Sequence, residues 1–148
     1  MNSKTSHFLL IIFTVLLIGP LIYIYQEHGL AEIQHSQESK ADGNEKKSIR
    51  QAGEGWFFIA IAWFYTIIAI LMVIKPFNIK IYYILVIITI GIVILYYLRT
   101  TTGIPVLWTG VIIKEYVVDW YDVITKILQQ VLVVPATALL VRTRYYHL

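Results

Sequence analysis

Six polar residues near the C-terminal end recur at a spacing that places them on one face of a helix. They are Glu115, Asp119, Asp122, Lys126 and the pair Gln129 and Gln130. At about 100° per residue, positions i, i+4, i+7, i+11 and i+14/i+15 fall within a single face. Ionisable groups in a membrane helix typically face a partner subunit, a path for protons or ions, or a cavity. The plain structural alternative is a solvated acidic first turn and a lysine whose stem reaches the interface.

Pairing within this stripe gives more specific expectations. Asp122 and Lys126 stand at i, i+4 with the acid first, the favourable order for an ion pair. Glu115 and Asp119 repel each other at the same spacing, and Arg99 is the expected cationic partner for them. Amide side chains inside a membrane tend to hydrogen-bond across helices, so the two glutamines favour contact with another subunit.

The composition indicates that these residues belong to a membrane protein. The 148 residues are 58% hydrophobic and 14% charged, whereas soluble domains are about 45–50% apolar and about 25% charged. The absence of cysteine excludes disulfides, thiolate metal sites and a cysteine nucleophile. The basic residues are scattered without a stripe that could follow phosphates, so nucleic acid is not an expected partner.

Four apolar segments predict transmembrane helices at 8–25, 56–74, 81–98 and 123–141. Each approaches the ~20 residues that cross a bilayer. The first could instead be a signal peptide cleaved near Gly29, but its length favours an uncleaved anchor. The fourth should continue a helix that starts at Ile113 with an interfacial first third, and Pro135 should kink it.

Two connecting segments remain. The segment 26–54 has soluble composition and is expected to be a polar external loop, in part flexible. His28 and His35 lie seven residues apart in it and could bind a metal on a helix, although two solvated histidines are the simpler interpretation. The segment 103–122 should break the third helix at Gly103 and Pro105, then form an interfacial or re-entrant segment that packs on the other helices.

Charge and aromatic residues predict the orientation. With four spans, both termini share a side with the short loop 75–80, and this side carries five basic residues and no acid. Short loops rich in Lys and Arg stay cytoplasmic, so both termini are expected on the cytoplasmic side of the cell membrane. Tyrosines and tryptophans cluster at the span ends, as is typical of anchoring at the headgroup level.

The segments 99–106 and 117–130 of the chain resemble small polytopic membrane proteins of ammonia-oxidising archaea. The resemblance covers the C-terminal third and implies an accessory subunit near the copper-dependent ammonia monooxygenase complex. The chain has no histidine-rich cluster that would make it the copper-bearing subunit.

We therefore expect an all-α integral membrane protein: a single membrane domain, 1–148, with four transmembrane helices and one short re-entrant or interfacial segment. No phosphate-binding loop, His-Glu-x-x-His or nucleophile elbow is present, so we expect a non-catalytic structural or accessory subunit without a cofactor. Its expected contact surface is formed by Arg99, Glu115, Asp119, Asp122, Lys126, Gln129 and Gln130. The alternatives are a homo-oligomeric channel or transporter lined by this stripe, and a metal-enzyme component that uses His28 and His35.

Overall fold

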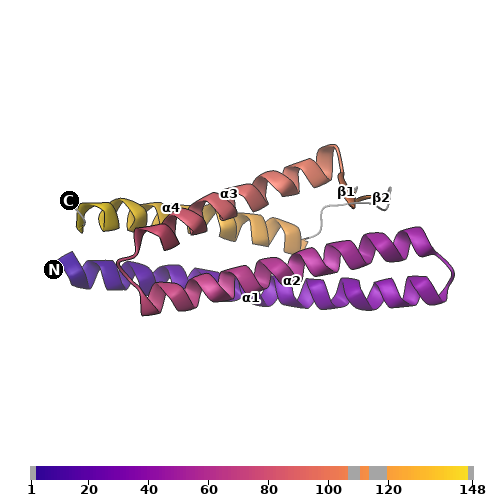
Figure 1. The fold of residues 1–148 in the computed structure, drawn as a ribbon, viewed down its shortest axis with the longest axis horizontal. Coiled ribbons are helices and arrows are strands. Elements are labelled where there is room, and N and C mark those ends of the chain that lie inside the picture. Colours follow the sequence, from indigo (N-terminus) through magenta and orange to yellow (C-terminus); the bar gives the residue numbers. More distant parts are fainter. Residues whose placement is uncertain (1–2, 107–110, 114–119, 147–148) are drawn as a thin grey trace.

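The computed structural model describes residues 3–106, 111–113 and 120–146, which form four long helices and two short strands (Figure 1). The elements are α1 (Ser3–Ala41), α2 (Glu45–Ile74), α3 (Ile79–Thr101), β1 (Ile104–Val106), β2 (Val111–Ile113) and α4 (Trp120–Tyr146). All four helices are long and apolar enough to cross a membrane, and each contains one of the four predicted spans. The predicted all-α membrane class is confirmed.

The helices form a bundle in which α4 lies against both α1 and α3, while α1 packs along α2. Both termini lie at the end of the bundle where α2 turns into α3 (Figure 1). Two contacts hold the first turns of α1 to this connection. His7 Nε2 donates a hydrogen bond to the carbonyl oxygen of Pro76 (2.8 Å), and its ring stacks on Phe77 with centroids 4.8 Å apart.

An apolar core fills the centre of the bundle, and apolar side chains also cover much of its outside. The fully buried aliphatic residues come from all four helices and include Ile18, Leu21, Met72, Leu85, Leu132 and Leu139. Ile87, Val73 and Val134 are more than half exposed. Apolar surface of this extent is unfavourable in water but not among lipid tails, so the outer faces of the spans are suited to a bilayer.

The predicted external loop 26–54 is wrong, because most of it is helical. The helix α1 runs without interruption to Ala41, α2 begins at Glu45, and the turn between them uses Gly43 at φ +76°. The 39 residues of α1 extend about 58 Å at ~1.5 Å per residue, well beyond the ~30 Å of a hydrocarbon layer. We call residues 26–54 the hairpin extension; it projects past the end of the four-helix bundle (Figure 1).

Small and polar residues hold the hairpin extension together. Ser36 Oγ donates a hydrogen bond to the carbonyl oxygen of Ser48 (2.9 Å), and Ser39 Oγ donates to Gln51 Oε1 (2.7 Å). Closer to the bundle, the backbones of Gly29 and Gly55 meet so closely that a Cβ on either would lie 2.8 Å from the carbonyl oxygen of the other. Composition alone missed these helices because each depends on burial against the other.

The region after α3 contains a small antiparallel sheet. Gly103 ends α3 with φ +84°, as its position predicts, and β1 then pairs with β2 so that Ile104 faces Ile113. The strand β1 contacts α3 and β2 contacts α2, so this region packs on other helices as expected. Whether the segment is re-entrant or interfacial stays open.

The predicted helix start at Ile113 is wrong, because Ile113 ends β2 and α4 is described from Trp120. β-branched residues fill Val111–Ile113 and favour extended backbone, and the helical spacing of the later polar residues masked this preference. The helix α4 then continues through Pro135.

Candidate functional site

The structure separates the predicted polar stripe into inward and outward residues. Gln129 is fully buried, Asp122 and Lys126 are partly buried, and Gln130 is exposed on the outside of α4. Glu115 and Asp119 lie outside the described residues. The two adjacent glutamines, which the spacing had placed on the same face, therefore lie in different surroundings.

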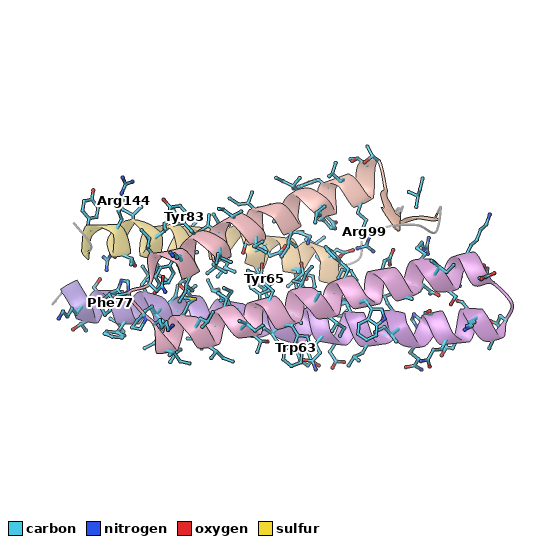
Figure 2. All side chains as sticks on the ribbon, in the orientation of Figure 1. Trp63, Tyr65, Phe77, Tyr83, Arg99 and Arg144 are labelled. Atoms are coloured by element: carbon cyan, nitrogen blue, oxygen red, sulfur yellow. The ribbon has the colours of Figure 1, made fainter. Side chains whose placement is uncertain are left out.

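Gln129 is the centre of a network of hydrogen bonds between the helices. Its Nε2 atom donates to the hydroxyl oxygen of Tyr25 on α1 (2.8 Å) and to that of Tyr65 on α2 (3.2 Å). The Tyr65 hydroxyl in turn donates to Thr89 Oγ1 on α3 (3.2 Å), so each of the four helices contributes a polar group. Figure 2 shows Tyr65 in the middle of the bundle. A buried amide is costly unless it is hydrogen-bonded, and this arrangement satisfies it from two helices.

Lys126 joins the same network from its edge. Its Nζ atom donates to the hydroxyl of Tyr25 (3.2 Å) and to Gln129 Oε1 (3.1 Å), and it lies 4.4 Å from the ring centroid of Tyr96. Asp122 and Lys126 do not form a direct salt bridge, since no N–O distance between them is within 4.0 Å, but the Asp122 carboxylate still acts on the ammonium group electrostatically. The ammonium group instead turns inward, where hydroxyl and amide oxygens and the face of an aromatic ring surround it. We call Tyr25, Tyr65, Thr89, Lys126 and Gln129 the interior network.

A buried ion pair lies on the side of the interior network nearest the hairpin extension. Arg99 Nη2 donates to Glu54 Oε2 at 3.3 Å, and the two side chains are only 11% and 10% exposed. The Arg99 guanidinium also lies 5.4 Å from the ring centroid of Phe58. This pair joins the end of α3 to α2 at the base of the hairpin extension (Figure 2).

The sequence predicted Arg99 as the cationic partner of Glu115 and Asp119, which lie outside the described residues. It did not predict the pair with Glu54, because Glu54 fell within the expected loop. One signal was available: Glu54 lies two residues before the second span and Arg99 directly follows the third, so both lie at the same membrane boundary. Tyr25, Tyr65 and Thr89 were also missed. Nothing in their local spacing distinguishes these residues from anchoring or core residues.

Several residues of the expected contact surface face the interior of the chain. Arg99 and Gln129 are buried and Lys126 is turned inward, so these side chains are used within the chain itself. Gln130 remains on the outside, next to the exposed residues Ile127, Val131 and Val134. The described part of the chain offers no hydrogen bond to its carboxamide group.

The two histidines do not meet at a metal site in the described residues. The ring of His28 lies 5.1 Å from that of Tyr121 and 6.2 Å from that of Phe58, while His35 is exposed on the hairpin extension. Throughout residues 3–106, 111–113 and 120–146, no three His, Asp or Glu side chains are grouped closely enough to hold a metal ion.

The arrangement is thus a bundle whose inward polar groups bind one another, while the carboxamide of Gln130 faces outward on α4. Comparison of the chain with models of protein families, with curated proteins and with solved structures finds no match.

Proposed function

We propose that this chain is a non-catalytic accessory subunit of a membrane complex and that it contacts a partner helix through the outward face of α4. The observation that carries this proposal is Gln130, a carboxamide exposed among Ile127, Val131 and Val134. A second helix that supplies a donor or an acceptor there would satisfy it.

The depth of Gln130 makes its exposure costly. Its neighbour Gln129 bonds to Tyr65, which bonds to Thr89, and both of these lie near the middle of their spans. Gln129 also bonds to Tyr25 at the end of the first span, so Gln130 lies within the apolar layer, between its middle and the edge nearest the hairpin extension. An amide transferred into an apolar environment without a hydrogen bond costs roughly 2–7 kcal/mol, depending on the reference state.

The interior network supports a structural role for the other polar residues. The amide of Gln129, the ammonium group of Lys126 and the hydroxyls of Tyr25 and Tyr65 bind one another across the bundle. Such contacts fix how the helices pack. They leave Gln130 as the exposed member of the described stripe, and thus the one on the outward face of α4.

The orientation of the subunit follows from the charge of the end that carries both termini. Because short loops rich in Lys and Arg stay in the cytoplasm, we place both termini and the loop 75–80 inside and the hairpin extension outside the cell membrane. The resemblance of the C-terminal third to proteins of ammonia-oxidising archaea makes the ammonia monooxygenase complex one candidate partner.

Purification from native membranes in mild detergent, followed by mass spectrometry, tests the proposal. We expect other membrane proteins to be recovered in fixed ratio to this chain. The Gln130→Leu variant should lower their recovery about tenfold, which corresponds to the loss of ~1–2 kcal/mol of interhelical hydrogen bonding. Gln130→Asn keeps the carboxamide group and should retain part of the recovery.

Recovery of the chain without a partner would contradict the accessory role. A homo-oligomer is the second candidate, because an amide both donates and accepts and two copies of Gln130 could pair across a two-fold axis. In that case the purified chain would be a dimer or larger assembly of one polypeptide. Ion flux into proteoliposomes would then test a channel or transporter, and flux no greater than in empty liposomes would exclude it.

A further inference from the structure

We infer that the end of the bundle that carries both termini binds the headgroups of anionic phospholipids. This end, which we call the basic end, presents the exposed cations Lys4, Lys75, Lys80, Arg142 and Arg144. They come from the start of α1, the end of α2, the start of α3 and the end of α4, so the fold gathers charges that are far apart in the sequence (Figure 1).

The parts of the chain that form the described residues of the basic end contain no acidic side chain. The segments 1–26, 55–114 and 123–148, which together contribute every residue of the basic end, have no Asp or Glu. The guanidinium of Arg142 donates a hydrogen bond to the hydroxyl of Ser6, a neutral group, and keeps its charge exposed. The basic end therefore has a positive potential that attracts anions.

The position of the cations matches the headgroup layer. Lys75 directly follows the apolar run of α2, Lys80 directly precedes that of α3, and Arg142 directly follows that of α4. The exposed rings of Tyr83 and Tyr145 lie beside them, and amphipathic rings favour this same level. The anion that meets this end of an embedded bundle is the phosphate of a lipid.

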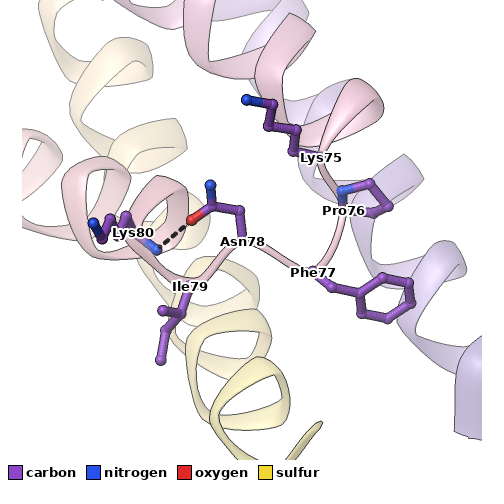
Figure 3. A pocket seen from close by; sticks show the side chains of 6 residues that line it. All are labelled: Lys75, Pro76, Phe77, Asn78, Ile79 and Lys80. Carbon is purple, nitrogen blue, oxygen red and sulfur yellow. Dashed lines mark hydrogen bonds between the residues drawn. The ribbon is translucent and has the colours of Figure 1, made fainter. Parts of the chain in front are cut away.

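The α2–α3 connection holds two of the cations in place. The Pro76 carbonyl accepts hydrogen bonds from His7 and from the hydroxyl of Tyr82, and Asn78 Oδ1 accepts one from the backbone N–H of Lys80 (3.1 Å). Lys75 and Lys80 border a shallow cavity of about 460 Å³ lined by this connection (Figure 3). Because these bonds fix its backbone, the connection loses little conformational entropy when a headgroup binds.

The opposite end of the molecule supplies a matched control. Lys46 and Lys47 are exposed at the tip of the hairpin extension, but Asp42 and Glu45 lie beside them in the sequence. The 16 residues 26–41 of α1 separate the last residue of its span from this tip, or ~24 Å of helix. These two lysines should therefore contribute little to lipid binding, although they carry the same charge as Lys75 and Lys80.

The test uses the full chain in detergent with an equimolar mixture of phosphatidylglycerol and phosphatidylcholine. Bound lipid is extracted after gel filtration and quantified by mass spectrometry. We expect wild type to be enriched in phosphatidylglycerol, and the enrichment to fall as salt is raised, since surface charges are screened. The double variant Lys75→Gln/Lys80→Gln should lower it about 30-fold, because each basic residue near an anionic surface contributes about fivefold. The matched variant Lys46→Gln/Lys47→Gln should retain the wild-type ratio.

Equal binding of the two lipids by wild type would overturn the inference. An equal loss in both double variants would overturn it too, because net charge rather than the basic end would then determine binding. Both variants change exposed side chains, and elution of each as a single species in gel filtration checks that it is folded.

Discussion

Gln129 and Gln130 are neighbours of the same type, yet one lies inside the bundle and the other on its surface. Gln129 donates to two tyrosine hydroxyls and accepts from Lys126, whereas Gln130 is exposed beside apolar side chains. A step of about 100° around the helix separates them. Residue type and depth alone therefore do not determine the role of a polar residue in this membrane chain; the face on which it lies does.

The inward and outward faces of α4 differ along its whole described length. The inward positions recur at alternating steps of four and three residues, namely Thr125, Gln129, Leu132, Ala136, Leu139 and Thr143. Ile127, Val134 and Val141 lie on the outward face and are exposed. If this comparison is right, substitutions of inward groups should cost stability, and those of outward groups should alter association instead.

The largest loss of stability is expected from the buried ion pair. Arg99→Leu would leave the Glu54 carboxylate buried without its cation, and removing one partner of a buried pair typically costs ~3–5 kcal/mol. The free energy of unfolding, measured by titration with a denaturing detergent, should fall by about this amount. Replacing both partners, as Arg99→Leu/Glu54→Leu, should restore much of the loss. If the double variant is no more stable than Arg99→Leu alone, the pair does not determine the effect.

A smaller loss is expected from the interior network. Gln129→Leu removes the amide that joins the hydroxyls of Tyr25 and Tyr65, and it also removes one hydrogen-bond acceptor of Lys126. Because Tyr65 keeps its hydrogen bond to Thr89 and Lys126 keeps its hydrogen bond to Tyr25, we expect the free energy of unfolding to fall by about 2 kcal/mol. The same unfolding titration measures it, and an unchanged midpoint would show that the network adds no stability.

The next largest loss of stability is expected where α1 and α2 are in close contact. A Cβ at Gly29 would lie 2.8 Å from both the carbonyl oxygen of Gly55 and a side-chain carbon of Ile59. Gly29→Ala should therefore separate the helices at a cost of ~1–3 kcal/mol, partly offset by about 1 kcal/mol of helix propensity. Gly91→Ala is the matched control, because a Cβ at Gly91 meets nothing within 4 Å and only the gain in propensity remains. Equal thermal stability of the two variants would refute the tight contact.

The smallest effect on stability is expected at the outward glutamine. Gln130→Leu removes a carboxamide that has no hydrogen bond within the described part of the chain, so the unfolding free energy of the isolated chain should change by less than about 0.5 kcal/mol. A loss as large as that of Gln129→Leu would remove the distinction between the two faces.

Much of the architecture was predictable from the sequence because the bilayer imposes simple rules. Apolar segments of adequate length predicted the four spans, and Gly103 predicted the end of α3. The hairpin extension was not predictable in this way. Its helices are held by contacts such as Ser36 with Ser48 and Gly29 with Gly55, which exist only when both helices are present.

The candidate site was predictable in its residues but not in its contacts. Helical spacing located Lys126, Gln129 and Gln130, but it could not show that Tyr25 and Tyr65 approach from other helices. Similarly, spacing could not show that Arg99 forms an ion pair with Glu54, which lies 45 positions earlier in the chain. Local periodicity gives the direction of a side chain relative to its own helix and contains no information about which helix lies opposite.

Photo-crosslinking at position 130 in native membranes tests the central claim most directly. A photoreactive amino acid replaces Gln130 in one variant and Ile87, an exposed residue of the apolar outer face of α3, in the matched control. We predict that position 130 gives a covalent adduct with another polypeptide and that position 87 gives adducts with lipid alone. Adducts with lipid alone at both positions would contradict the proposal that the outward face of α4 contacts a partner.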